Sequence, residues 1–404
     1  MKHGNWLILT VLFIAGCNSA DKVAQPPPED IPEEAAPDHG SEPANAQPMN
    51  QPESEPRGSE VFEATSEEAE EEEKFSKVDV YFATDRQRVD NTRPDLRYGP
   101  TRNMEGDHLE YGKAIVTIPD IHVPGRVERP KWWKFEFRED EKKHVVLREP
   151  KLMEEGEFYR SIQASTSSNP ADELLMFVHG FNVSWGDAMR RTGQISYDLG
   201  FGGVTLCYSW PSQGSLKKYP VDKENSEWTI PHLTKVLMDL QSQTEIGKVH
   251  IIAHSMGTRA LTYAIANAKD AGIELDLNNI ILAAPDIDRD IFKEQILPKI
   301  EGHTDLLTMY ASSDDEALKI SRSFNGSPRL GLSGDSIFVI PQRMDTIDAT
   351  GIDTSLLGHS YYGSQQVVVK DIFGVIVKGL LPPARSLSQG DYGEWDLPLA
   401  PPPQ

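Results

Sequence analysis

Short apolar runs recur along the chain from about residue 78 onward, with polar or small residues between them. Valine, isoleucine and aromatic residues are frequent in these runs, which is typical of strands buried in a sheet. Their length, five to seven residues, also fits strands better than helices. Strands are therefore predicted at residues 78–83, 112–118, 174–178, 203–209, 248–253, 279–284, 306–310 and 336–340.

Longer segments with helical periodicity lie between most of the later strands, at residues 185–198, 224–240, 258–268 and 288–300. Alternation of such helices with nearly continuous apolar strands is typical of a mostly parallel sheet covered on both faces. We therefore predict an α/β fold with a doubly wound sheet flanked by helices and preceded by a strand-rich extension. Functional groups on such a sheet gather at the carboxyl ends of its strands.

The first residues have a different pattern. A basic start at Lys2 precedes an apolar run over residues 6–15 that is too short to span a bilayer, which indicates an export signal. The run ends in Ile14-Ala15-Gly16-Cys17, which resembles the bacterial lipobox. That resemblance implies lipid attachment at Cys17 and a membrane-anchored protein of the bacterial cell envelope. The alternative is an ordinary secretory signal with an incidental cysteine.

Residue 18 is asparagine rather than aspartate, which resembles the sorting pattern of outer-membrane lipoproteins. An outer-membrane location, facing the periplasm or the cell surface, is therefore expected rather than the inner membrane. The lipid would make the membrane one partner of the protein. With Cys17 lipidated, Cys207 has no cysteine partner, and its apolar surroundings predict a small buried core residue.

Residues 18–75 are rich in Pro, Glu, Ala and Ser and hold 17 acidic residues against 3 basic ones. Such a segment cannot bury enough apolar surface to offset its ordering entropy, so it is predicted to be a disordered tether. It contributes most of the chain's net charge of −23, and no basic face stands out elsewhere. Nucleic acid is therefore not an expected partner. The predicted organisation is a leader (1–17), a tether (18–75), a strand-rich part (76–170), a catalytic core (171–380) and a Pro-rich tail (381–404).

Candidate chemistry begins at Ala253-His254-Ser255-Met256-Gly257, which stands at a predicted strand-to-helix junction. It matches the nucleophile elbow G-x-S-x-G except that alanine replaces the first glycine. Small residues two before and two after the serine allow the sharp turn that lifts its Oγ above the sheet. The Met256 N–H would then face a developing oxyanion. A serine that merely caps the following helix is the alternative.

Possible partners of Ser255 occur in an informative order. An earlier strand ends in His179-Gly180-Phe181, which resembles the oxyanion loop of lipases and esterases, with Phe181 presenting a second N–H donor. Asp315 follows a later strand, and His359 lies in a glycine-flanked loop after the last strands. Ser, Asp, His is the order of the α/β-hydrolase triad. Asp286 is the alternative acid, because a few hydrolases take it from the preceding strand.

Residues 76–380 resemble bacterial α/β-hydrolases long catalogued as a domain of unknown function and described as esterase- or lipase-like. The resemblance rests on VDVYFATDR, FVHGFNVSWGDAMRR, YSWPSQGS, HIIAHSMG, LAAPDIDRDIF and DTSLLGHSYY. It implies the α/β-hydrolase fold and a Ser-His-Asp hydrolase, and it says little about the substrate.

The expected mechanism is acyl transfer through Ser255, with His359 as base, Asp315 as its orienting acid, and Phe181 and Met256 as oxyanion donors. The substrate would be a small-molecule or lipid ester, and neither a cofactor nor a metal is expected, since the histidines show no ligand spacing. Thioesterases, amidases, peptidases and acyltransferases use the same constellation, and a non-catalytic envelope scaffold is a further alternative. Residues that could line a pocket are His179, Gly180, Trp210, Tyr219 and Trp228.

Overall fold

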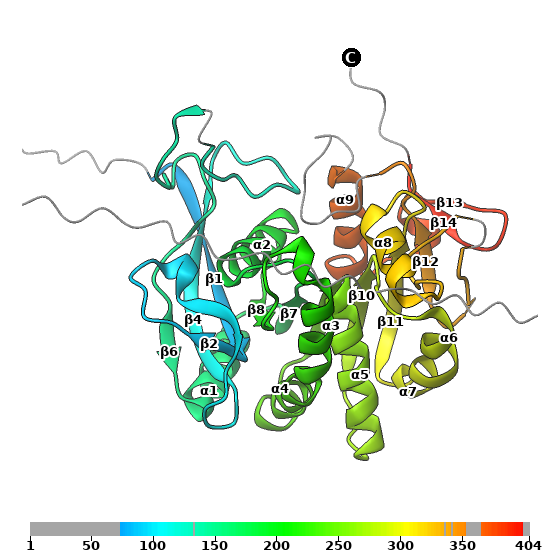
Figure 1. Ribbon diagram of the computed structural model, residues 1–404, viewed down its shortest axis with the longest axis horizontal. Helices are drawn as coiled ribbons and strands as arrows, with labels where there is room; N and C mark the ends of the chain where they lie inside the picture. The colour runs from blue at the N-terminus through cyan, green and yellow to red at the C-terminus, as the bar shows by residue number, and fades with distance from the viewer. Residues whose placement is uncertain (1–72, 132–133, 335–336, 341, 353–364, 399–404) are drawn as a thin grey trace, which may run out of the picture. The chain divides into compact units, whose positions relative to one another are not determined.

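The computed structural model describes residues 73–131, 134–334, 337–340, 342–352 and 365–398 (Figure 1). Glu70–Gln404 forms one compact unit, distinct from Met1–Ala69. The leader, Cys17 and nearly all of the predicted tether lie outside the described residues, as does His359. No helix in the described ranges is long and apolar enough to cross a membrane.

A twelve-stranded sheet runs through the unit in the order β13-β14-β12-β11-β10-β9-β7-β8-β1-β4-β5, with β6 beside β4. In this spatial order, each strand from β14 to β1 is parallel to its neighbours within that range, as the alternating pattern predicted. They are β1 (Phe75–Thr84), β7 (Glu173–Val178), β8 (Val204–Ser209), β9 (Lys248–His254), β10 (Leu277–Ala283), β11 (Thr304–Ala311), β12 (Asp345–Asp348) and β14 (Trp395–Asp396).

Antiparallel strands extend both edges of this sheet. Three belong to the strand-rich extension, and a separate hairpin precedes them. This part of the chain is the predicted extension ahead of the α/β core. The additional strands are β4 (Glu110–Pro119), β5 (Val146–Leu147), β6 (Lys151–Met153) and β13 (Ser388–Gln389), and the hairpin is β2 (Arg86–Arg88) with β3 (Tyr98–Arg102).

Helices cover both faces of the sheet because its strands are apolar on both sides. In β7, Leu174, Met176 and Val178 pack into one buried cluster, whereas Leu175 and Phe177 pack into another. This period of two is that of a strand whose side chains point alternately to opposite faces. One cluster contains residues of α1 (Glu155–Ser167), α4 (Ile230–Gln243), α5 (Met256–Asp270) and α7 (Leu297–Ile300), and the opposite face carries α2 (Trp185–Asp198) and α9 (Gln365–Ile376).

Two predicted helices differ in detail. The segment 224–240 is two helices, α3 (Tyr219–Trp228) and α4, with Thr229 between them. The segment 288–300 is α6 (Arg289–Ile291), a π-helical turn η4 (Phe292–Ile296) and α7. Helical periodicity detects the apolar face of such segments but does not resolve a change of hydrogen-bond register. The remaining helical elements are η1 (Pro94–Leu96), η3 (Leu216–Lys218), α8 (Glu316–Asn325) and η5 (Pro382–Ala384).

The predicted strand at 336–340 is wrong. Its described residues, 337–340, are irregular and make only an isolated bridge from Ile340 to Met344. They are apolar because they pack against the core, where the Phe338 ring meets Phe292 edge-on at 6.4 Å. The strand beside β11 is instead β12, whose short sequence DTID lacks an apolar run.

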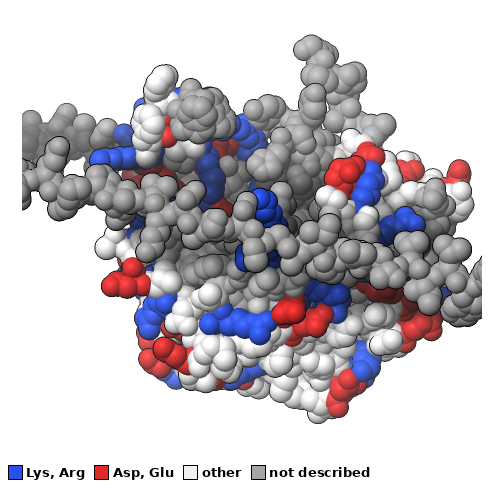
Figure 2. Space-filling view, in the orientation of Figure 1, with Lys and Arg blue, Asp and Glu red and all other residues white. Residues whose placement is uncertain are grey.

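The surface view in Figure 2 shows lysine and arginine side chains interspersed with aspartate and glutamate on the described part of that face. A continuous basic track, which a phosphate backbone would require, is not visible there. Functional groups of such a fold gather at the carboxyl edge of the parallel strands, where β7, β8, β9, β10 and β11 all end.

Candidate active site

Ser255 occupies a strained turn between β9 and α5. Its backbone has φ 49° and ψ −121°, a conformation that side-chain-bearing residues rarely adopt. The turn is fixed by hydrogen bonds: the Ser255 N–H donates to the Ala283 carbonyl at 2.9 Å, and the Ser255 carbonyl accepts from the Thr258 N–H at 3.1 Å. Strain of this kind persists only where surrounding contacts enforce it, and it occurs at functional sites. The geometry is that of a nucleophile elbow.

Two glycines allow the elbow to contact the loop after β7. A Cβ on Gly257 would lie 2.2 Å from the His179 carbonyl oxygen, and one on Gly180 would lie 2.8 Å from the Ser255 Cβ. Neither distance is sterically possible, so both positions require glycine. Ala253, which replaces the first glycine of the motif, is fully buried at the end of β9. The elbow and the predicted oxyanion loop are therefore in direct backbone contact.

The two expected oxyanion donors follow from this arrangement. Met256 is the first residue of α5, where an N–H has no partner within the helix. Phe181 directly follows Gly180 in the neighbouring loop. Among the described residues, no backbone acceptor takes the N–H of either residue. Both N–H groups are thus available near Ser255, as an oxyanion hole requires.

Arg86, which sequence reasoning missed, contacts the predicted oxyanion loop through its side chain. Its guanidinium is fully buried and donates to the Val183 carbonyl at 2.8 Å, the Ser209 Oγ at 2.9 Å and the Ser212 carbonyl at 3.0 Å. It also contacts the Gly99 carbonyl and the His179 Nε2, both at 3.3 Å. Burial lowers the pKa of Arg86 to about 10, so it remains a cation at neutral pH. One side chain thus links the loops that follow β1, β7 and β8.

Asp222 on α3 contacts two of these loops, those that follow β7 and β8. Its carboxylate accepts from the Asn182 N–H at 3.2 Å, the Ser212 Oγ at 2.6 Å and the Gln213 N–H at 2.7 Å. Asn182 needs this support because its φ is 61°. Burial raises the pKa of Asp222, and the hydrogen bonds and Arg86 oppose that shift. One sequence feature could have indicated a role for Arg86 and Asp222, namely that these charged residues lie close to buried strands and their loops.

Two of the expected pocket residues support the loop instead of lining an open pocket. His179 and Trp210 are both fully buried and stack with ring centroids 5.0 Å apart. The Trp210 Nε1 donates to the His179 carbonyl at 2.7 Å. Burial and the Arg86 cation hold the pKa of His179 well below its ordinary value, so the ring is neutral.

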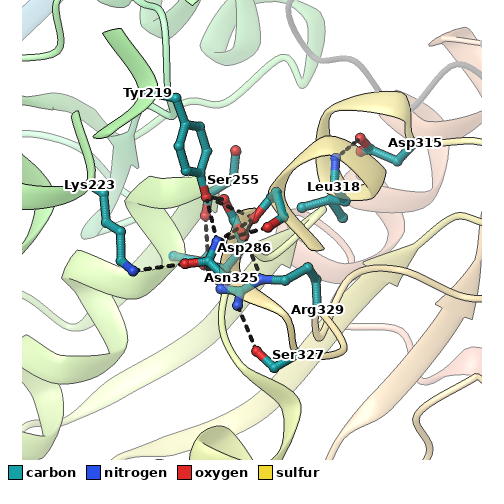
Figure 3. Close-up of polar contacts among 11 residues, drawn as sticks. Tyr219, Lys223, Ser255, Asp286, Asp315, Leu318, Asn325, Ser327 and Arg329 are labelled. Carbon is teal, nitrogen blue, oxygen red and sulfur yellow. Dashed lines mark hydrogen bonds and ion pairs between the residues drawn. The ribbon is translucent and has the colours of Figure 1, made fainter. Parts of the chain in front are cut away.

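Tyr219 and Asp286 lie beside Ser255 in a polar network (Figure 3). The Asp286 N–H contacts the Ser255 carbonyl at 3.3 Å, and the Tyr219 hydroxyl donates to the Asp286 carboxylate at 2.8 Å. That carboxylate also accepts from the Ser321 Oγ at 2.6 Å and the Arg329 Nε at 2.7 Å. Asp286 and Arg329 are both buried, so the alternative triad acid is already neutralised by a cation.

Asp315 is the N-cap of α8, where its carboxylate accepts from the Leu318 N–H at 2.9 Å. Figure 3 shows it outside the network around Asp286. Burial raises the pKa of Asp315, and repulsion from Asp286 adds to the shift. The adjacent Asp314 is exposed and accepts from the Gly351 N–H at 3.0 Å, on the segment that follows β12. Both carboxylates thus lie in the turn after β11.

His359, the expected base, lies outside the described residues. The described chain reaches residue 352 after β12 and resumes at α9, so position 359 falls between β12 and that helix in the sequence. Trp228 is at the end of α3, where Arg102 stacks over its ring at 5.1 Å and His232 meets it edge-on at 4.4 Å. The structure therefore brings Tyr219 next to Ser255 and places Trp228 in a separate cluster.

Across the described ranges, no group of three or more His, Cys, Asp or Glu residues is arranged to hold a metal ion. Residues 154–376 match the family described as alpha/beta hydrolase of unknown function (DUF900). No curated protein matches the chain.

Three similar solved structures are an esterase from Pyrobaculum calidifontis, the iron-lacking apo form of ESTFA and lipase B from Aspergillus fumigatus. The first has 10% identity and a TM-score of 0.30, covering 51% of this chain and 76% of that one. The second has 12% identity and a TM-score of 0.29, covering 52% and 78%. The third has 10% identity and a TM-score of 0.29, covering 50% and 53%.

Proposed function

Because this chain belongs to the α/β hydrolases of unknown function, whose match spans more than half of it, we propose that it is a serine hydrolase that cleaves carboxylic esters through an acyl-enzyme on Ser255. The observation that carries the proposal is the backbone of Ser255. A serine held at φ 49° at the end of a central parallel strand, in contact with a glycine-containing loop, is the geometry that an exposed nucleophile requires.

In the proposed reaction, His359 takes the proton of Ser255 as Oγ attacks the ester carbonyl, and the carbonyl oxygen becomes an oxyanion. The N–H groups of Phe181 and Met256 stabilise that charge. Asp315 orients the histidine and stabilises the imidazolium, which returns the proton to the departing alcohol. Water, activated by the same histidine, then releases the acid and regenerates Ser255.

Replacing the nucleophile tests this proposal. Ser255→Ala should reduce hydrolysis of p-nitrophenyl esters of short acyl chains by several orders of magnitude, because no acyl-enzyme can form. The fold should persist, since the turn is held by backbone bonds that alanine retains. A fluorophosphonate probe should label the wild type and not the variant. Ser323→Ala, a serine on the far turn of α8, is the matched control. Equal labelling of Ser255→Ala would remove Ser255 from its role.

We also propose that a lipid on Cys17 anchors the protein in the cell envelope, in the outer membrane rather than the inner one. The support is the lipobox-like tetrad followed by a segment that forms a unit distinct from the catalytic part. Cys17→Ser should move the protein from the salt-washed membrane fraction to a soluble or unprocessed form while ester hydrolysis persists. A correctly cleaved variant that stays with salt-washed membranes would point to another anchor.

A further inference from the structure

The loop at residues 134–143, between β4 and β5, exposes two phenylalanine side chains, whereas its acidic side chains are paired with basic groups of the protein. Phe135 is 82% exposed and Phe137 is 77% exposed, among the most exposed large apolar residues described. Phe135 also has a φ of 57°. Phenylalanine is normally buried, and an exposed pair of this kind on a folded surface is typical of a binding face.

The shape of this loop is set by polar contacts and not by the two phenylalanines. Glu136 accepts from the Lys131 N–H at 2.9 Å and from the His144 Nε2 at 3.3 Å. The Asp140 N–H donates to the His144 Nδ1 at 3.1 Å. His144 is buried, so these bonds close the base of the loop. The phenylalanines are therefore held outward by a fixed scaffold.

The remaining acids of the loop are partly exposed, and each is paired with a basic residue, as Asp140 is with Lys143. Glu139 pairs with Arg190, whose side chain is buried on α2, and Glu141 binds Arg148 through two bonds of 2.7 and 2.9 Å. Lys134 and Arg138, which flank the phenylalanines, are exposed. The loop thus presents aromatic rings next to the cations of Lys134 and Arg138, while its acids are already paired with other bases.

The loop lies near the edge of the sheet that carries Ser255. Arg129, just before it, pairs with Asp187 in the first turn of α2, and α2 begins shortly after the carboxyl end of β7. Loop and elbow are therefore placed at the same edge, separated by α2 and the oxyanion loop.

We propose that the 134–143 loop is a membrane-docking surface that binds phospholipid bilayers with anionic headgroups. Aromatic rings partition into the boundary between headgroups and acyl chains, and adjacent cations are attracted to anionic lipids. Phe135 and Phe137 would supply the first interaction, and Lys134 and Arg138 the second. This surface is independent of Cys17 and does not depend on the chemistry at Ser255.

Vesicle sedimentation tests the proposal with the compact unit Glu70–Gln404, which lacks Cys17. It should sediment with vesicles of phosphatidylglycerol and phosphatidylcholine in equal parts, and more weakly with phosphatidylcholine alone. Phe135→Ser with Phe137→Ser should lower the partition coefficient by about tenfold or more. Tyr392→Ser, which alters an aromatic residue that is also 77% exposed, should not change it. Lys134→Gln with Arg138→Gln should abolish the preference for anionic vesicles.

Failure of the wild-type unit to sediment with either vesicle, or unchanged binding of the phenylalanine variant, would overturn the proposal. So would a wild-type dimer that the phenylalanine variant converts to a monomer in analytical ultracentrifugation, because the face would then bind a second copy. All of these variants should hydrolyse a soluble ester at the wild-type rate. A loss of vesicle binding is thereby distinguishable from a failure of the proposed esterase activity.

Discussion

On the side of Ser255 toward β7 and β8, the candidate site is made of backbone in close contact, whereas on the side toward β10 and β11 it is made of carboxylate side chains. The first side depends on steric exclusion: Gly180 and Gly257 leave no room for a side chain, and Arg86 joins the loop after β7 to neighbouring segments through five contacts. The second side depends on charge, with Asp286, Asp314 and Asp315 all near the ends of neighbouring strands.

The difference shows that proximity to the serine does not identify a catalytic acid. Asp286 lies closest along the hydrogen-bond network, yet its charge is already matched by buried Arg329. Asp315 makes no ion pair with any residue that the structure describes and instead caps α8. A carboxylate that must stabilise an imidazolium cannot be fully committed to an arginine. The comparison therefore favours the turn after β11 as the source of the acid.

The largest expected difference between variants of these carboxylates is in kcat. Asp315→Asn should lower kcat on the order of 10⁴-fold, because the base loses both its tautomer control and its counter-charge, as in the known protease case. Asp286→Asn should instead lower the free energy of unfolding by about 3 to 5 kcal/mol, because it leaves Arg329 buried without a counter-charge. Steady-state kinetics and urea unfolding on both variants give the comparison, with Asp314→Asn as the exposed control.

The opposite result would reverse the assignment. If Asp286→Asn abolishes turnover in folded protein while Asp315→Asn stays within about tenfold of wild type, the acid comes from the loop after β10. Ser255 would keep its role in that case, because the elbow geometry does not depend on which carboxylate serves the base.

The contrast between the backbone side and the carboxylate side of the site also explains which features the sequence could predict. The elbow was predictable because a five-residue pattern, AHSMG, encodes both the turn and the small residues that it needs. The parallel core was predictable because buried strands must be apolar on both faces. Arg86 was not, because a charged residue after a strand is usually solvated, and only the fold shows three loops converging on it. The short strand β12 was missed for a related reason, since Asp345 and Asp348 hide its pattern.

Arg86→Lys should produce the next largest effect, a fall in kcat of about 10- to 100-fold with a smaller change in KM. Lysine keeps the charge but has three donors on one nitrogen, so it cannot reach the carbonyls of Val183 and Ser212 and the Ser209 hydroxyl together. The oxyanion loop should loosen while substrate contacts largely persist. Arg148→Lys, which weakens a two-bond surface pair with Glu141, is the matched control and should leave kcat unchanged. An unaltered kcat in Arg86→Lys would show that the loop holds its shape without the guanidinium.

The smallest expected effect concerns pH and the two buried histidines on the backbone side. Burial lowers the pKa of His254 to about 4, and the pKa of His179 lies well below its ordinary value. An unfolded histidine titrates near about 6.5, so below that pH the unfolded chain takes up protons that the folded protein does not. Stability should therefore be complete above about pH 6.5 and decline as the pH falls toward about 4.

His254→Asn should reduce this decline in urea unfolding measured across that range. The acid limb of ester hydrolysis should remain near about pH 6.5 in the same variant, since it reports the proposed base, His359, and not His254. A limb that shifts together with the unfolding midpoint would mean that activity is lost through unfolding of the elbow and not through titration of His359.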